Sequence, residues 1–272
     1  MDYFERAPVT EQDKMKSYYK YFNRELEDIS AEKKKILEHP MLPEGTGLEL
    51  SERNKIFDDG YLPDEIGVSR LKSGGYCFAN QNFIPGGTGE MLQWWFAWHP
   101  LDNLRYRIWD PRDHYEVGIS EETRKKLMDP DIPLIEKCQN VKHSNRETVL
   151  LGTDPISVVL TFMKPSDMGW DESKIGTEKC SFFVCGNVVK PEGGGWPIVI
   201  MHSARDVKGG CEHRSRIWVG YQIKDGKEVC VAPEHFEIPI EGIRNQLQHH
   251  FFEFINLAAI LPQIYEEEKN NW

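Results

Sequence analysis

The feature that most constrains the fold is a periodic apolar pattern near the C-terminus. Apolar side chains recur there at intervals of three or four residues: Ile243, Leu247, Phe251, Phe254, Leu257, Ala258 and Leu261. This spacing predicts a helix, beginning at about Ile243, with one face that must be buried. The rest of the chain therefore has to supply a layer that covers this face.

Two polar residues of the same stretch carry chemistry. His249 and Glu253 are four residues apart, so on a helix they are neighbours on one face. An imidazole and a carboxylate one turn apart can share a metal ion, or they can form a plain ion pair, which is the more common arrangement. The spacing alone leaves both interpretations open.

The region before this helix has the pattern of a β-sheet. Runs of β-branched and aromatic residues are separated by turns at 193–195, 209–210 and 225–226. The runs are residues 146–152, 157–162, 179–186, 197–202, 214–221 and 228–232. Consecutive strands with short turns predict an antiparallel sheet. A curved sheet followed by one long helix can bury the helix on its concave face and enclose a cavity, which is an α+β architecture.

The N-terminal quarter has a different character. Helices are expected within residues 14–22 and 30–38, the second capped by Ser30 and ended by His39-Pro40. Residues 41–70, rich in Pro, Gly and Asp, are expected to form a connecting loop. We therefore predict an N-terminal helical segment over residues 1–70, a candidate region for forming a homodimer, and a catalytic domain over 71–272.

Composition excludes some classes of partner. A net charge of −11 argues against binding to nucleic acid or to an anionic membrane. No apolar run reaches the length of a membrane span, and the first residues lack the pattern of a secretion signal, so we expect a cytoplasmic protein. The six cysteines are dispersed without a CxxC motif, which predicts free, mostly buried thiols.

Aromatic residues gather in the stretch 90–100. Trp94, Trp95 and Trp98 lie within five positions and are followed by Pro100. The stretch can form a buried aromatic element or the wall of an aromatic pocket, and these alternatives are compatible.

Further polar residues are candidates for the same site. His114 follows a proline-containing turn, Glu147 stands beside Arg146, and His202 ends an apolar run. Together with His249 and Glu253 they include a set of two imidazoles and two carboxylates that suits zinc. Sequence spacing links only His249 and Glu253 to each other. Glu147 can equally be a surface residue, and His202 can equally be a hydrogen-bonded core residue.

Several blocks of the sequence resemble the family of diacetylphloroglucinol and phloretin hydrolases. They are residues 94–100, residues 105–114, residues 210–220 and the pair His249 and Glu253. The resemblance covers roughly residues 70–265 in the expected order. It implies a helix-grip fold like that of the birch pollen allergen, with an added N-terminal helical segment.

The resemblance also implies a site. One Zn²⁺ would be bound by His114, Glu147, His249 and Glu253. His202 would be the catalytic histidine, with His213 as a competitor for that role, and Tyr106 would face the substrate. Trp94, Trp98 and Trp218 are expected to contact the substrate, with Trp95 beside them.

The reaction implied is hydrolysis of the carbon–carbon bond between an acyl carbonyl and a phloroglucinol-type ring. A zinc ion can polarise the acyl oxygen and acidify water. The ring can leave because its keto tautomer makes the departing carbanion an enolate. His202 would move the proton to the ring carbon, and Tyr106 would bind a ring oxygen.

The resemblance implies a small aromatic ketone as the substrate, and phloretin is favoured because no polar residue obviously closes a small acyl pocket. Its products would be phloroglucinol and 3-(4-hydroxyphenyl)propanoate. The alternatives are a diacetylphloroglucinol hydrolase, a non-catalytic carrier of hydrophobic ligands, and an interaction protein that acts through its N-terminal helices.

Overall fold

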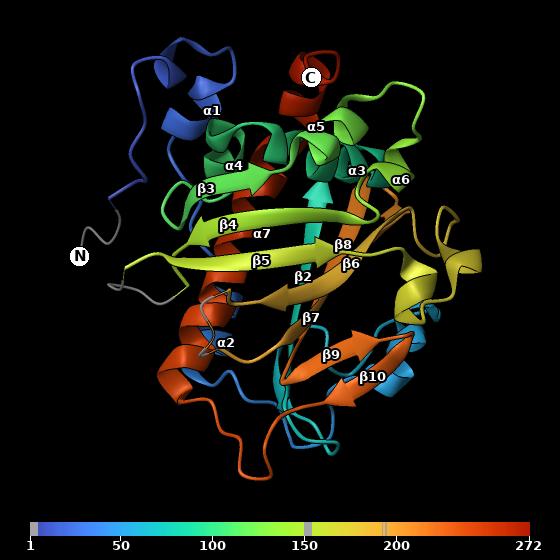
Figure 1. The fold of residues 1–272 in the computed structure, drawn as a ribbon. Helices are drawn as coiled ribbons and strands as arrows, with labels where there is room; N and C mark the ends of the chain where they lie inside the picture. The colour runs from blue at the N-terminus through green and yellow to red at the C-terminus, as the bar shows by residue number, and fades with distance from the viewer. Residues whose placement is uncertain (1–4, 150–153, 192, 194) are drawn as a thin grey trace.

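A single large antiparallel sheet and one long helix organise the protein, as the computed structural model shows (Figure 1). The structure describes residues 5–149, 154–191, 193 and 195–272. The sheet has the strand order β1-β2-β8-β7-β6-β5-β4-β3. Its strands are β1 (Gly67–Arg70), β2 (Tyr76–Pro85), β3 (His114–Ile119), β4 (Val141–Glu147), β5 (Ile156–Phe162), β6 (Phe182–Val189), β7 (Ile198–Val207) and β8 (Gly210–Val219).

A separate hairpin joins β9 (Tyr221–Lys224) to β10 (Lys227–Cys230). Its turn residues Asp225 and Gly226 both have positive φ, the conformation that tight hairpin turns require. The α-helices are α1 (Tyr19–Asn23), α2 (Ala31–Glu38), α3 (Gly89–Trp98), α4 (Asn103–Trp109), α5 (Glu121–Met128), α6 (Leu134–Lys137) and α7 (Ile240–Glu268).

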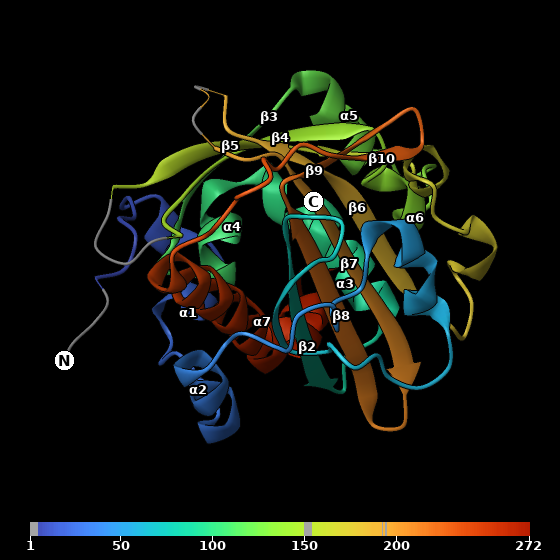
Figure 2. The same cartoon turned by 90° about the horizontal axis from the view of Figure 1, so that it is seen from below.

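Helix α7 is the C-terminal helix that the periodicity predicts, and it begins three residues earlier than expected, directly after Pro239. It packs along β2 and buries the predicted apolar face, including Leu247, Phe251 and Leu257. Seen from below, the sheet curves around this helix (Figure 2). The predicted α+β helix-grip architecture is therefore confirmed.

The two faces of the sheet bury different cores. Strand residues alternate between the faces, so Ile217 points toward the cavity beneath α7 while Trp218 joins the core on the opposite face. The opposite face is covered in part by a 3-10 helix, Leu50–Phe57.

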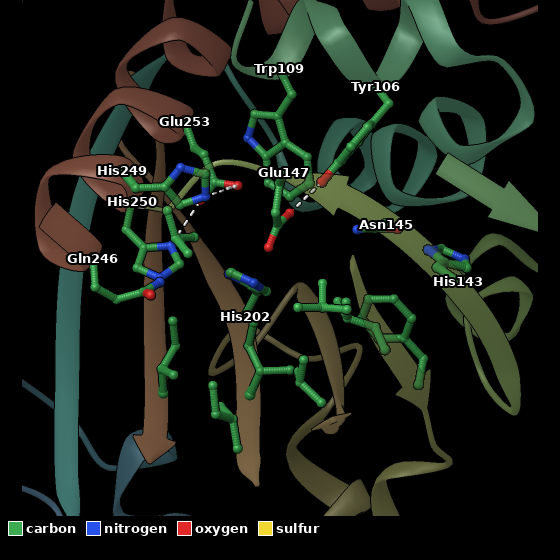
Figure 3. A pocket seen from close by; sticks show the side chains of 18 of the residues that line it. Tyr106, Trp109, His143, Asn145, Glu147, His202, Gln246, His249, His250 and Glu253 are labelled. Carbon is green, nitrogen blue, oxygen red and sulfur yellow. Dashed lines mark hydrogen bonds and ion pairs between the residues drawn. The ribbon is translucent and has the colours of Figure 1, made fainter. Parts of the chain in front are cut away.

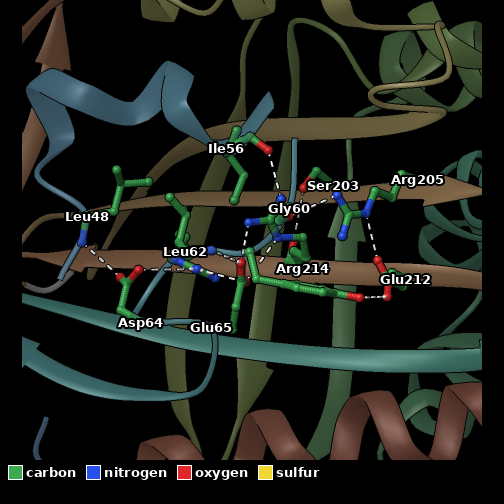
Figure 4. A network of polar contacts seen from close by, with 12 residues as sticks. Leu48, Ile56, Gly60, Leu62, Asp64, Glu65, Ser203, Arg205, Glu212 and Arg214 are labelled. Carbon is green, nitrogen blue, oxygen red and sulfur yellow. Dashed lines mark hydrogen bonds and ion pairs between the residues drawn. The ribbon is translucent and has the colours of Figure 1, made fainter. Parts of the chain in front are cut away.

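Polar contacts attach this N-terminal region to the sheet (Figure 4). Glu65 lies 3.0 Å from the Arg216 guanidinium and also pairs with Arg214, which in turn donates to the carbonyl oxygen of Ile56 at 2.8 Å. Lys33 of α2 donates to the side-chain oxygen of Asn80 on β2. The first 70 residues are thus packed onto the sheet, and β1 within them is one of its strands.

The helix caps follow the sequence. The hydroxyl of Ser30 accepts the N–H of Lys33 and α2 ends at Glu38, while Ser120 accepts the N–H of Thr123 at the start of α5. Both N-caps satisfy an amide that would otherwise lack a partner.

Several strand and loop boundaries differ from the prediction. Residues 41–70 are more than a connecting loop, because they contain the 3-10 helix and β1. The predicted strand over 146–152 is wrong in extent: β4 ends at Glu147, and residues 150–152 lie outside the described part of the chain. The sequence pattern missed most of β4 because its buried positions alternate as Val141, His143 and Asn145, of which two are polar.

None of the described helices is both long and apolar enough to cross a membrane. All six cysteines are free thiols, and Cys230 is the exposed one.

Candidate metal centre and active-site cavity

The four predicted metal ligands lie close together beside α7. Figure 3 shows three of them, Glu147, His249 and Glu253, at the cavity. His114 begins β3 and Glu147 ends β4, and the two are directly paired across the strands. The register shifts by one residue immediately after this pair, between His114 and Glu116, and such bulges often re-aim a side chain beside a functional site. His249 and Glu253 come from adjacent turns of α7.

Their candidate ligand atoms lie close to one another in pairs and in one group of three. Glu253 Oε1 lies 3.1 Å from His114 Nε2 and 3.6 Å from His249 Nε2. Candidate ligand atoms of His114, Glu147 and His249 all lie within 4.8 Å of one another. His114 Nε2 is buried and makes no hydrogen bond of acceptable geometry, despite the nearby carboxylate. His114 Nε2 and Glu253 Oε1 are close enough to form an ion pair, and the same two atoms can instead both bind one metal ion.

Neighbouring groups hold each ligand from behind. His114 Nδ1 lies 3.1 Å from the carbonyl oxygen of Tyr106, and His249 Nδ1 lies 3.0 Å from Asp113 Oδ2. The Tyr106 hydroxyl donates to Glu147 Oε2. Hydrogen bonds through Nδ1 leave the Nε2 lone pair of each histidine for a metal, which is the usual arrangement behind metal-ligating imidazoles.

The charges of the cluster are strongly coupled. Burial acts to lower the pKa of His249, but Glu253 and Asp113 overcome it and raise this pKa to about 10. Burial acts to raise the pKa of Glu253, but the imidazoles of His249, His114 and His250 bring it well below its ordinary value. The carboxylate is therefore ionised and needs a positive charge beside it, which protonated imidazoles or a divalent cation can provide.

The donor set fits zinc. Two imidazole nitrogens and carboxylate oxygens are ligands that Zn²⁺ prefers, and protein ligands of a catalytic zinc leave a position for water or substrate. Other divalent first-row metals are compatible with the same donors.

Two other groups of side chains in the described chain are close enough to hold an ion, but they fit less well. In the first, His250 is occupied on both nitrogens, by Glu253 at 2.9 Å and by Gln246 at 2.7 Å. In the second, Asp110 accepts from Arg112 and Asp113 is bonded to His249. These groups therefore support the main cluster and do not replace it.

The cluster closes one end of a cavity of about 130 Å³. The cavity wall is mainly apolar, with aromatic side chains from α3, α4 and β5. Apolar lining residues include Phe96, Trp109, Leu160, Phe162, Val188, Ile200 and Ile217. Tyr106 and His202, both predicted for the site, also line it.

His202 and His213 occupy different positions. His202 faces the cavity from β7, and burial lowers its pKa to about 3, so its imidazole is neutral. His213 on β8 is fully buried, stacks on Phe254 with the ring centroids 3.7 Å apart, and places Nε2 3.3 Å from His202 Nδ1. His213 thus contacts the candidate catalytic histidine from behind.

The structure does not bring the predicted tryptophans to this cavity. Trp94 and Trp98 lie on the opposite face of α3 from Phe96; Trp98 packs against Tyr18 and donates to the carbonyl oxygen of Asn271. Their position follows from helix geometry, because residues four apart share a face that Phe96 does not.

The prediction that Trp218 contacts the substrate in this cavity is also wrong. It lies on the outer face of the sheet and donates to the carbonyl oxygen of Leu48. The aromatic wall of the cavity is formed instead by Phe96, Trp109 and Phe162.

Polar residues that the sequence reading did not single out also belong to the site. His143 and Asn145 point from β4 into the cavity, and His143 Nε2 and Asn145 Oδ1 have no hydrogen-bond partner among the described residues. Asp113 and His250 support the ligands. The sequence offered a signal for Asp113 and His250, because each is adjacent to a predicted ligand. No local sequence pattern distinguishes His143 or Asn145.

Fold and site together define a class of protein: a helix-grip domain whose apolar cavity ends at a cluster of two histidines and two glutamates suited to a divalent metal. Residues 48–266 match the family described as the DAPG hydrolase PhiG domain, and the chain belongs to this family.

Named relatives agree with this family. The chain is 39% identical to "Phloretin hydrolase" of Eubacterium ramulus, over 98% of this chain and 96% of that protein. It is 26% identical to "2,4-diacetylphloroglucinol hydrolase" of a Pseudomonas species, over 93% of this chain and 88% of that protein. Among solved structures, Ara h 8.0201 matches with a TM-score of 0.34 and 8% identity over 65% of this chain and 98% of that chain, a likeness too distant to carry an argument.

Proposed function

We propose that this protein is a zinc-dependent hydrolase that cleaves the carbon–carbon bond between an acyl group and a phloroglucinol-type ring. The favoured substrate is phloretin, with phloroglucinol and 3-(4-hydroxyphenyl)propanoate as products. The observation that carries the proposal is the convergence of His114, Glu147, His249 and Glu253 at the end of a cavity that also contains His202. Membership of a hydrolase family supports the reaction class.

The four converging residues would hold the zinc ion. Bound there, zinc supplies Lewis-acid polarisation of a carbonyl oxygen and a water of lowered pKa. Asp113 would keep His249 oriented, and Tyr106 would keep Glu147 oriented, through the hydrogen bonds described above.

His202 is proposed to move the proton. Its neutral imidazole can accept a proton from water or from a ring hydroxyl and deliver it to the ring carbon. In the balanced reaction the hydroxyl of water ends on the acyl carbon, the bond from acyl carbon to ring carbon breaks, and the ring carbon keeps the electron pair and receives the proton. A positioned proton transfer of this kind typically contributes about 10²–10⁴-fold to the rate.

The ring hydroxyls are proposed to bind Tyr106, His143 and Asn145. Burial and Glu147 keep the pKa of Tyr106 well above its ordinary value, so its phenol stays protonated and its oxygen can accept from a ring hydroxyl. Burial lowers the pKa of His143 to about 4, so a neutral imidazole faces the cavity. With the unpaired oxygen of Asn145, these groups suit a ring that has several hydroxyls.

The test is to incubate the purified protein with phloretin, monoacetylphloroglucinol and 2,4-diacetylphloroglucinol in parallel. Each reaction is run with added zinc and with a chelator, and the ring and acid products are quantified by chromatography. We expect zinc-dependent release of phloroglucinol from phloretin at the highest rate. Preference for the diacetyl compound would favour the alternative hydrolase, and binding of all three without products would favour a carrier. The predicted homodimer remains a prediction.

A further inference from the structure

A second cavity opens beyond the one that contains the metal cluster. It has a volume of about 730 Å³. It lies between the first residues of α7, the first residues of β5 and β7, and the last residues of β6. The two cavities share part of their walls. The shared residues are Val149, Ile156, Val158, Val188, Ile198 and Gln246. A ligand can therefore extend from the inner cavity into the outer one without leaving the protein.

The inner cavity has room for little more than one ring. Its volume of about 130 Å³ is close to that of an apolar protein cavity, about 150 Å³, that binds a single benzene molecule. If the phloroglucinol ring lies beside the metal cluster and His202, an acyl chain longer than acetyl has to continue past the shared wall.

The outer cavity is suited to an aromatic group. Phe78, Trp196, Phe236 and Ile238 line it, and the Trp196 and Phe236 rings pack with centroids 4.6 Å apart. Trp196 is 44% exposed, so part of its ring is available to contact a ligand in this cavity. This surface can stack on an aromatic ring and make apolar contacts. None of the histidines that line the inner cavity lines the outer one.

Polar groups occur at two defined places. Gln246 stands at the junction of the cavities, where it is bonded to His250 at 2.7 Å. Lys190, Glu237 and Glu241 lie among the residues of the outer cavity and can meet a hydroxyl at the far end of a ligand.

We propose that the outer cavity is the acyl-arm subsite, which binds the aryl end of a 3-arylpropanoyl group and gives this enzyme its preference for arylalkanoyl over acetyl substrates. The proposal rests on the hydrolase function proposed above. It assigns specificity to residues outside the metal cluster, chiefly Trp196, Phe236, Ile238 and Gly242.

Gly242 provides a selective way to block the subsite. A Cβ atom at this position of α7 would lie 3.4 Å from Ile238 Cγ2, so alanine fits with at most a small adjustment while phenylalanine has to occupy the outer cavity. The variants Gly242→Phe and Gly242→Ala are compared with the wild type for kcat/KM on phloretin and on monoacetylphloroglucinol.

We expect Gly242→Phe to lower the ratio of kcat/KM for phloretin to kcat/KM for monoacetylphloroglucinol by at least about tenfold. Apolar pockets readily provide discrimination of this size. Gly242→Ala should keep the wild-type ratio. An unchanged ratio in folded Gly242→Phe, or an equal loss on both substrates, overturns the subsite. Trp196→Ala is a second variant at an exposed position, and it should raise KM for phloretin alone.

Calorimetric binding separates this proposal from the hydrolase function. The probe is the diarylpropane in which a methylene replaces the carbonyl of phloretin, so it cannot be cleaved. Wild type should bind it, and Gly242→Phe should bind it at least about tenfold more weakly. If the wild type cleaves neither substrate but shows this difference in binding, the proposed reaction fails and the subsite stands. Equal binding to wild type and Gly242→Phe refutes the subsite, whatever the turnover.

Discussion

Asp113 illustrates control of the candidate metal centre by a residue that is not itself a predicted ligand. Its carboxylate lies 3.0 Å from His249 Nδ1, on the side away from the other ligands. We predict that Asp113→Asn lowers zinc affinity about 10–100-fold, the usual cost of removing such support. Competition with a chromophoric chelator measures the affinity, and exposed Asp58→Asn is the control. Equal affinities for both variants would show that Asp113 does not tune the site.

The ligands themselves should be indispensable. His249→Ala or Glu253→Ala removes a donor from the cluster, so bound zinc and turnover should be lost together. Metal content per chain, measured by elemental analysis, is the readout, and His235→Ala on the surface is the control. A variant that keeps its full metal content would remove that residue from the ligand set.

His202 should behave differently from the ligands. It lines the cavity and its ring is bonded to His213, but it donates nothing to the cluster. His202→Ala should keep its zinc while kcat falls about 10²–10⁴-fold. A normal kcat in a zinc-loaded variant would exclude His202 from proton transfer.

At the scale of elements, α2 is attached to the sheet through a buried lysine. Lys33 donates to Asn80 and Asn82 of β2 and lies 4.5 Å from the centre of the Phe251 ring on α7. Burial lowers the pKa of Lys33 to about 7, whereas an unfolded chain has a lysine pKa of about 10.4.

This difference predicts a dependence of stability on pH. Between pH 7 and about 10.4 the unfolded chain binds more protons at Lys33 than the folded chain, so the Lys33 contribution to stability increases as pH rises through this window. Below pH 7 both states are protonated and the contribution is constant. The slope is at most roughly 1.4 kcal/mol per pH unit.

The prediction is tested by the difference in unfolding free energy between wild type and Lys33→Met across pH 6–10. The unfolding free energy of the wild type, relative to that of Lys33→Met, should increase as pH rises, because the variant lacks the titrating group. Lys35→Met, on an exposed position of the same helix, should follow the wild type. A difference that is flat from pH 7 to 10 would contradict the lowered pKa.

At the scale of the whole molecule, the metal cluster connects distant parts of the chain. His114 and Glu147 belong to strands at one edge of the sheet, while His249 and Glu253 belong to the C-terminal helix. A ligand that binds only the folded state stabilises it by about 2.7 kcal/mol at a hundredfold excess over Kd.

Chelation should therefore lower the stability of the entire fold. We expect the melting temperature to fall by about 5–10 °C on removal of zinc, measured by circular dichroism. Glu253→Ala is the control, because its melting temperature should not respond to the chelator. The same response in both proteins would indicate an effect unrelated to the cluster.

Local patterns were sufficient for several elements. The spacing of Ile243, Leu247 and Phe251 predicts a helix with one buried face, and Ser30 predicts a helix start that the structure confirms. Strand β4 was largely missed because the residues it turns inward, such as His143 and Asn145, serve the cavity and break the apolar alternation.

The sequence by itself determined the period of α7 and of strands such as β5, β6, β7 and β8, and the pairing of His249 with Glu253, because these depend on residues close together along the chain. Only the tertiary structure decided that His114 and Glu147 meet them, and that Trp94, Trp98 and Trp218 face away from the cavity. Strand register and helix rotation set these outcomes, and both are fixed by packing between segments that lie far apart in sequence.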